Sequence, residues 1–411
     1  MPIDFELTPQ QEKLRDDTRE LAQDFAARAL EHDAERSIPV ENFEKMRDAG
    51  LYGLVVPEKY GGMGMGAMGW VIVAGEIAKV DAATAMGFNM HINATGGILN
   101  RHAEIPDEVR ERVARLVLDE GALMCTSVSE PTSSSVLPLT YTPAVHARRA
   151  DGGWTLHGRK FFASIFEAAD YCYFYAHPEQ IENFQHSIGL VVPTKQDGIS
   201  VTDIWDTHGM RSTRSNQVDY DGAFVPEELV LYETENFLDS FIIEEADWAW
   251  GGFAAVYLGL AEGILEWAKH YVAGRKAKGY AQEMGYHPDI STRIGQMETE
   301  VEAARFLTWR AAWESDTKGP SPDYFRRWLH AKFAVANATQ RLVTDALPAC
   351  GLHALFRKEG FELKLRDAAT AAIMPPNSGA AATMIGLLTM GLDPQQAPSL
   401  RLQEPEPAIA S

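Results

Sequence analysis

Three carboxylates stand close together in the run Ile242–Trp248. They are Glu244, Glu245 and Asp247. A carboxylate held beside a substrate can accept a proton as a general base, which makes Glu244 and Glu245 candidate catalytic residues. The same charges also suit the first turn of a helix, where the macrodipole favours negative groups. From the sequence, both interpretations stay open.

Other patterns that carry chemistry are absent or fail on their context. The twelve histidines show no H-x-x-x-H pairing and no C-x-x-C occurs, so no metal site is predicted. No G-x-S-x-G is present, which removes the hydrolase nucleophile signature. Gly64–Gly69 fits G-x-G-x-x-G, but Pro57 intervenes before it and the surroundings read as helical. We therefore do not interpret it as a dinucleotide-binding turn.

The elements that must position these residues change along the chain from helical to β and back to helical. Thr8-Pro9 predicts a helix start, and helical patterns continue to about Asp119. Short strands broken by turn residues begin near Leu123, and helical periodicity returns after about Asn236. We predict an α+β protein with four parts: an all-α domain 1–121, a β domain 122–235, a helical bundle 236–393 and a flexible tail 394–411.

The overall charge limits the partners. Acidic residues outnumber basic ones by 58 to 37, giving a net charge of −21. Such a surface repels phosphate backbones and anionic lipid, so we expect neither nucleic acid nor a membrane as a partner. The three cysteines are far apart, and no secretory signal is visible at the N-terminus. These features predict a cytoplasmic protein.

Three stretches, in order, resemble acyl-CoA dehydrogenases. The first is Val55–Gly64 (V-V-P-E-K-Y-G-G-M-G), which is similar to the family's turn between N-terminal helices. The second is Ser129–Ser135 (S-E-P-T-S-S-S), which resembles T-E-P-G-x-G-S and is followed at the expected distance by Gly158–Ser164. The third is Gly209–Thr213 (G-M-R-S-T), and Leu365-Arg366-Asp367-Ala368 adds a C-terminal match. The resemblance spans nearly the whole chain.

The resemblance implies a helical domain, a central β-barrel or sandwich domain and a C-terminal four-helix bundle. FAD would lie between the β domain and the bundle, partly against a neighbouring subunit in a homodimer or homotetramer. The implied partners are an acyl-CoA or another acyl thioester and a protein that accepts or supplies electrons. In that chemistry a carboxylate removes the α-proton of the thioester while the β-hydrogen leaves as hydride to the flavin.

Residue by residue, the resemblance implies a set of cofactor contacts around one flavin. Ser129 matches a hydroxyl near flavin N5, Thr126 lies at the ring edge, Phe162 takes the place of a stacked aromatic, and Ser164 matches a hydroxyl at the polar edge. The alternatives are a polar β-loop for the serines and a core position for Phe162.

The resemblance assigns further contacts in the C-terminal half and in the second stretch. Arg275 matches an arginine that reaches the FAD pyrophosphate of a partner subunit; a solvated helix residue is its alternative. Gly351 matches the first glycine of a turn near the cofactor, and Asn377 is also assigned to the cofactor. Ser135 and Asp247 are assigned to the substrate.

The resemblance fails at the catalytic base. Most of the family places a glutamate in R-D-A-x(6)-E-G-T, and here Pro375 stands at that position. A second branch places it at the start of the first bundle helix, which corresponds to Ala249. Neither residue can take a proton. Glu245, four residues before Ala249, would lie one helical turn earlier on the same face and is the candidate displaced base.

Three functions follow as hypotheses. The first is α,β-dehydrogenation of an acyl thioester with a displaced base. The second is a flavin-dependent monooxygenase on the same fold, which needs no α-proton base. The third is a non-catalytic flavin-binding subunit of a hetero-oligomer.

Overall fold

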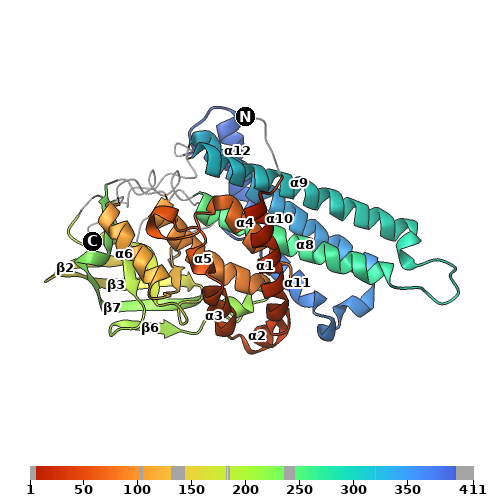
Figure 1. The fold of residues 1–411 in the computed structure, drawn as a ribbon, viewed down its shortest axis with the longest axis horizontal. Coiled ribbons are helices and arrows are strands. Elements are labelled where there is room, and N and C mark those ends of the chain that lie inside the picture. Colours follow the sequence, from red (N-terminus) through yellow and green to blue (C-terminus); the bar gives the residue numbers. More distant parts are fainter. Residues whose placement is uncertain are drawn as a thin grey trace, which may run out of the picture.

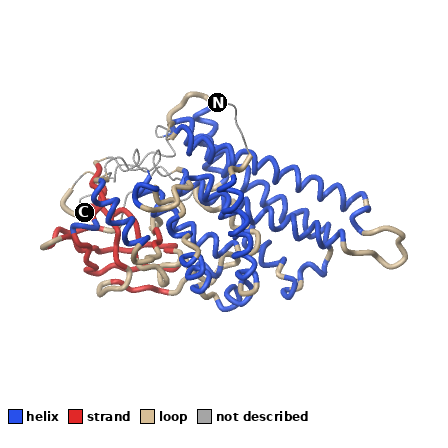
Figure 2. The backbone as a smooth tube through the Cα atoms, in the orientation of Figure 1, coloured by secondary structure: helices blue, strands red, loops and turns tan. Residues whose placement is uncertain are grey.

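A computed structural model describes residues 6–100, 105–130, 144–181, 183, 186–235, 246–319 and 321–394 of the 411-residue chain. Figure 1 shows a β-rich end and a helical end, with the N-terminal helices packed between them. Figure 2 shows the strands gathered at one end, while long helices run side by side toward the other. The predicted class, helical regions on both sides of a central β domain, is confirmed.

The N-terminal helices begin where their caps predict. Thr8 and Gln11 form a capping box in which the Thr8 hydroxyl accepts the Gln11 N–H and the Gln11 side chain accepts the Thr8 N–H. The helices of this part are α1 (Pro9–Ala26), α2 (Ala29–Glu35), α3 (Val40–Asp48), α4 (Gly66–Ala78), α5 (Ala82–Asn100) and α6 (Asp107–Leu118).

Helix α5 lies at the centre of the protein, and nearly every residue of it is buried. Asp81 caps its start, since its carboxylate accepts the Thr84 backbone N–H at 3.0 Å and the Thr84 hydroxyl at 2.6 Å. A helix covered on all sides needs no polar face. This explains why the sequence shows no amphipathic period at Ala82–Asn100.

The described strands form one sheet in the order β6-β7-β3-β2-β4-β5-β8, and β1 pairs in parallel with β4. The predicted run of short strands that begins near Leu123 is confirmed, since the strands lie between Met124 and Thr234. The strands are β1 (Met124–Thr126), β2 (His146–Ala150), β3 (Gly153–Ala163), β4 (Tyr171–Pro178), β5 (Ser187–Pro193), β6 (Ile199–Thr202), β7 (Asn216–Pro226) and β8 (Val230–Thr234).

The C-terminal half is a bundle that starts with a π-helical turn, Asp247–Gly251, continuous with α8. Long helices pack along α8 and extend away from the sheet (Figures 1 and 2). The helices are α8 (Gly252–Ala273), α9 (Pro288–Lys318), α10 (Pro322–Cys350), α11 (Phe361–Ala368) and α12 (Ser378–Thr389).

The three regions meet where the Gly209–Thr213 segment contacts α11. A Cβ on Gly209 would lie 2.4 Å from the Arg366 carbonyl oxygen, so only glycine fits this approach. The Met210 N–H donates to Asp367 Oδ1 at 2.6 Å, and Arg366 forms an ion pair with Asp33 of α2 at 2.6 Å. The motif therefore joins the sheet region to both helical regions.

Candidate active site

The loop after β1 is held by a buried ion pair. Glu130 is 3% exposed and Lys160 of β3 is fully buried, and the two side chains form a salt bridge. Lys160 also donates to the Tyr175 carbonyl oxygen at 3.2 Å. Burial lowers the pKa of Lys160, and the Glu130 carboxylate opposes that shift. The pair fixes the position of Ser129, whose carbonyl accepts the Phe161 N–H at 2.8 Å.

Phe162 is presented to solvent by an unusual backbone. Its φ is 58°, a conformation that a large side chain rarely adopts, and the residue is 52% exposed. Its ring lies 5.8 Å from that of Trp205 in an edge-to-face arrangement. The alternative of a core aromatic is therefore wrong. A strained backbone that exposes an aromatic ring is typical of a ligand contact.

Beside Phe162, a chain of buried hydroxyls runs inward. Ser164 hydrogen-bonds Ser215 at 2.7 Å, and Ser215 hydrogen-bonds Thr213 at 2.8 Å. The Thr213 hydroxyl then donates to the Met210 carbonyl oxygen at 2.8 Å. Each hydroxyl can donate or accept, so this chain can adjust to a partner whose protonation changes.

Thr126 lies on the opposite side of the same loop and faces α5. It is 5% exposed, and its hydroxyl donates to Met90 Sδ at 3.4 Å. The structure thus brings Thr126 and Ser129 onto one short segment, with Phe162 on β3 and Ser164 directly after that strand.

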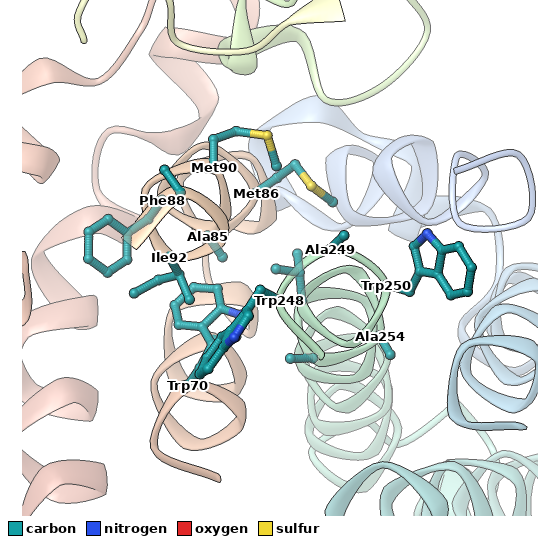
Figure 3. Close-up of a cluster of buried hydrophobic side chains, with 14 of the residues drawn as sticks. Trp70, Ala85, Met86, Phe88, Met90, Ile92, Trp248, Ala249, Trp250 and Ala254 are labelled. Atoms are coloured by element: carbon teal, nitrogen blue, oxygen red, sulfur yellow. The ribbon is translucent and has the colours of Figure 1, made fainter. Parts of the chain in front are cut away.

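The π-helical turn at the start of α8 lies against α5. Figure 3 shows Trp248 directed toward α5, and Trp250 directed the other way. A Cβ on Gly96 of α5 would lie 2.3 Å from the Trp248 ring, so the two elements touch closely. Asp247 is 1% exposed; its N–H donates to the Tyr324 hydroxyl at 3.2 Å, and its carboxylate accepts the Trp248 N–H at 3.1 Å. Single π turns inside helices occur frequently at functional sites.

The turn between α11 and α12 offers no base. Residues 369–376 carry no acidic, basic or histidine side chain, and Pro375-Pro376 is a cis peptide. The Lys332 ammonium, 1% exposed, donates to the Ala371 carbonyl oxygen at 3.0 Å, and the Tyr257 and Thr370 hydroxyls are 2.7 Å apart. Burial lowers the pKa of Lys332 to about 7. Asn377 caps α12, its side-chain oxygen accepting the Ala380 N–H at 2.8 Å.

Arg275 and Gly351 form a separate group at the helical end. Arg275 follows α8; its guanidinium lies 4.7 Å from the Tyr271 ring and donates to the Tyr271 hydroxyl. Gly351 ends α10 with φ 80°. Burial raises the pKa of the neighbouring Cys350 thiol, and the Arg275 charge opposes that shift. Figure 1 places this end far from the strands, so one chain does not bring Arg275 to Ser129.

Three predicted site residues, Glu244, Glu245 and Ser135, lie outside the described residues.

The glycine motif at Gly64–Gly69, which we do not interpret as a dinucleotide-binding turn, has a structural role. The N–H groups of Ala67 and Met68 donate to the Asp316 carboxylate at 2.7 and 2.9 Å, so this helix start already holds an anion.

Two other predictions concern metals and membranes. In the part of the chain that the structure describes, no group of His, Cys, Asp or Glu side chains is arranged to hold a metal ion. By length and composition one described helix, Asp247–Ala273, could cross a membrane, but 89% of its most apolar window is buried inside the protein.

Sequence reasoning missed the α5 face that meets this site. Met86, Asn89, Met90 and Asn93 recur at the i, i+3, i+4, i+7 spacing of one helical face. Two asparagines inside an apolar run were the signal that could have found it. Asp367 and Lys332 were missed as buried titrating groups because their burial depends on contacts distant in sequence.

Comparisons with known proteins cover the same regions. Three family models match: the acyl-CoA dehydrogenase N-terminal domain over residues 8–117, the middle domain over 125–223 and the C-terminal domain over 241–391. The short-chain specific acyl-CoA dehydrogenase of Clostridium acetobutylicum is 24% identical over 370 residues, which are 89% of this chain and 94% of that protein.

Two solved structures share the fold. A glutaryl-coenzyme A dehydrogenase in complex with glutaryl-CoA matches with a TM-score of 0.84 at 23% identity, covering 95% of this chain and 98% of that chain. The dibenzothiophene monooxygenase TdsC from Paenibacillus sp. A11-2 matches with a TM-score of 0.81 at 21% identity, covering 92% and 97%.

Proposed function

Because the chain belongs to the acyl-CoA dehydrogenase family, we propose that it is an FAD-dependent oxidoreductase that removes hydrogen from the α and β carbons of an acyl thioester. The observation that carries this proposal is Phe162, held at φ 58° with half of its surface exposed beside the buried Ser164 hydroxyl. A flat aromatic face next to a hydroxyl that can donate or accept fits a flavin ring. Bound FAD would supply the hydride acceptor, which no amino-acid side chain can provide.

The chain's own residues would hold the cofactor in two places. Thr126, Ser129, Phe162 and Ser164 would surround its ring, with Ser129 kept in position by the buried Glu130–Lys160 pair. Arg275 and Gly351 lie at the opposite end of the molecule (Figure 1). Contact of one FAD with both groups therefore needs two chains, which supports a homodimer or homotetramer.

For proton removal we propose Glu245, with Glu244 as the second candidate. The basis is the sequence: Ala249 and Pro375 hold the two positions that the family uses, and neither takes a proton. Asp247 would contact the substrate from the π turn, and Asn377 the cofactor. Electrons would leave through a separate acceptor protein. We place the protein in the cytoplasm on the basis of its reduced cysteines and acidic surface.

A second function, flavin-dependent monooxygenation, rests on one specific observation. The turn at residues 369–376, where most family members carry the base, has no proton-accepting side chain. Chemistry that needs no α-proton base would tolerate this, and the fold is shared with the monooxygenase TdsC.

The test is an anaerobic titration of the purified flavoprotein with straight-chain acyl-CoAs, following the absorbance of oxidised flavin. Dehydrogenation predicts bleaching by at least one thioester, and Glu245→Gln should slow it by roughly 100-fold or more. Glu300→Gln, at an exposed position on α9, is the matched control and should leave the rate unchanged.

The other outcomes separate the alternatives. The monooxygenase would be established by two results together. Thioesters never bleach the flavin, and the protein inserts oxygen into an aromatic substrate when a reductase and O₂ are added. A protein that binds FAD but shows neither reaction would favour the non-catalytic flavin-binding subunit, and one that does not bind added FAD would contradict all three hypotheses.

A further inference from the structure

One face of α5 carries polar groups into the protein interior next to the proposed site. Met86, Asn89, Met90 and Asn93 share this face, and none is more than 6% exposed. Side chains of methionine pack adaptably around ligands of varied shape. The two amides among them are unusual in a fully buried helix.

This face borders the two parts of the proposed site. Met90 Sδ accepts the hydroxyl of Thr126, the predicted flavin-edge residue, at 3.4 Å. The amide of Asn89 lies against Gly252, since a Cβ there would be 2.1 Å from Asn89 Oδ1. Gly252 lies one turn after Ala249, and Figure 3 shows Met86, Met90 and Ala249 grouped where α5 meets the start of α8.

The amides have unused hydrogen-bonding capacity. Asn89 Oδ1 accepts the Trp70 Nε1–H at 3.0 Å, which leaves the Nδ2 hydrogens as donors. Within the described residues neither Asn89 Nδ2 nor Asn93 Oδ1 has a hydrogen-bond partner, although both atoms are buried. Buried polar groups are nearly always paired, because leaving one unpaired costs the solvation it had in water. A partner that both donates and accepts is therefore expected here.

We propose that Asn89 and Asn93 bind a hydroxyl group on the acyl chain of the substrate, which makes the substrate a hydroxylated acyl thioester rather than a plain alkyl one. The two residues are four apart on one helix face, with Cβ atoms about 5–6 Å from each other. A single hydroxyl would bridge the two amides by accepting from Asn89 Nδ2 and donating to Asn93 Oδ1. This inference rests on the proposed dehydrogenase function and specifies its substrate class.

The test compares matched thioesters on the holoenzyme. Butyryl-, hexanoyl- and octanoyl-CoA are each paired with the ω-hydroxy derivative, and binding is measured by calorimetry and by anaerobic flavin bleaching. At one chain length the hydroxylated member should bind roughly 10- to 100-fold more tightly than its plain counterpart. Asn93→Leu should reduce that ratio to about 1.

Asn93→Leu also gives a readout without ligand. Because it removes an acceptor that has no partner, it should raise the melting temperature of the ligand-free protein while it removes the discrimination. Thr18→Val is the matched control. Among the described residues the buried Thr18 hydroxyl also has no partner, but it lies on α1, so its loss should leave the ratio unchanged.

The failures are distinguishable. If no thioester bleaches the flavin or binds, the proposed function fails. If plain and hydroxylated thioesters bleach it equally and bind equally at every length, this inference alone is overturned, and a buried water satisfies the amides. A ratio that persists in Asn93→Leu would also overturn it.

Discussion

The buried carboxyl of Asp367 allows a quantitative prediction about stability. Asp367 is 3% exposed on α11, and its Oδ1 accepts the Met210 N–H at 2.6 Å. Burial raises the pKa of Asp367 from 3.8 to about 7; the Met210 N–H and Arg366 oppose the shift, while Asp33 and Asp81 add to it. Asp367→Asn keeps an oxygen that can accept the Met210 N–H but removes the titrating group.

The sign follows from proton binding. Between pH 3.8 and about 7 the folded state keeps the Asp367 proton while the unfolded state releases it. The unfolded state therefore binds fewer protons, and the stability contributed by this group falls as pH rises through that window. The full loss above the window is about 4 kcal/mol, of which roughly 2–3 kcal/mol develops between about pH 5 and about pH 8.

Asparagine does not titrate, so Asp367→Asn should escape this loss. Its buried Nδ2 group adds a cost of about 1–3 kcal/mol that does not depend on pH. The variant should therefore gain roughly 2–3 kcal/mol relative to the unsubstituted protein between about pH 5 and about pH 8. The measurement is urea unfolding of both proteins at the two pH values, under the same flavin occupancy.

The control is Asp151→Asn, at an exposed position in the turn between β2 and β3. Its effect on the free energy of unfolding should be small and nearly the same at both pH values. The reasoning is refuted if the Asp367→Asn difference is independent of pH, or if the variant loses stability relative to the unsubstituted protein as pH rises.

Three further substitutions test contacts around the site. Lys160→Met leaves Glu130 buried without its cation and should lower the free energy of urea unfolding by about 3–5 kcal/mol. Adding Glu130→Gln should recover part of that loss. A double variant that loses as much stability as the two single variants together would argue against the pair. Gly96→Ala would place a methyl group 2.3 Å from the Trp248 ring and should lower the melting temperature. Gly75→Ala, whose methyl group would meet nothing within 4 Å, should not lower it. Equal changes in melting temperature for the two variants would contradict the close contact. Asn377→Ala should cost about 1 kcal/mol by removing the α12 cap, and Asn377→Ser should restore most of it; no difference between the two would exclude a capping role.

The parts of the fold that could be predicted are those whose signals are local. The Thr8 cap of α1 and the strand at 171–177 are specified by neighbouring residues, and both are present. Helix α5 was missed because it is buried on every side, so its residues have no polar face to reveal a period. The π turn at Asp247–Gly251 was also missed, since a run of apolar residues does not distinguish it from the start of an α-helix.

In the candidate site, too, some residues could be predicted from local sequence motifs and others could not. Ser129 and Phe162 could be located by motif, but the left-handed backbone that exposes Phe162 depends on its surroundings in the sheet. Asp367 and Lys332 are ordinary charged residues in sequence. Their altered pKa values arise from burial by segments more than a hundred residues away or across the bundle, which no local pattern encodes.

The departures from the family pattern concern one region of the structure. The π turn before α8 carries Ala249, while the first half of α8 contacts the Asn89 amide at Gly252 and binds the 369–376 turn through Tyr257. The positioning contacts farther away, such as the Glu130–Lys160 pair and the Met210–Asp367 bond, are intact. The sequence predicts that Ala249 and Pro375 hold the family's two base positions, yet the contacts that would position a flavin and a thioester are present. These contacts, together with two α5 amides that each have one buried atom without a partner among the described residues, argue that the change concerns which substrate is bound and how its proton leaves. Thioesters that carry hydroxyl groups are for this reason the substrates to test before aromatic ones.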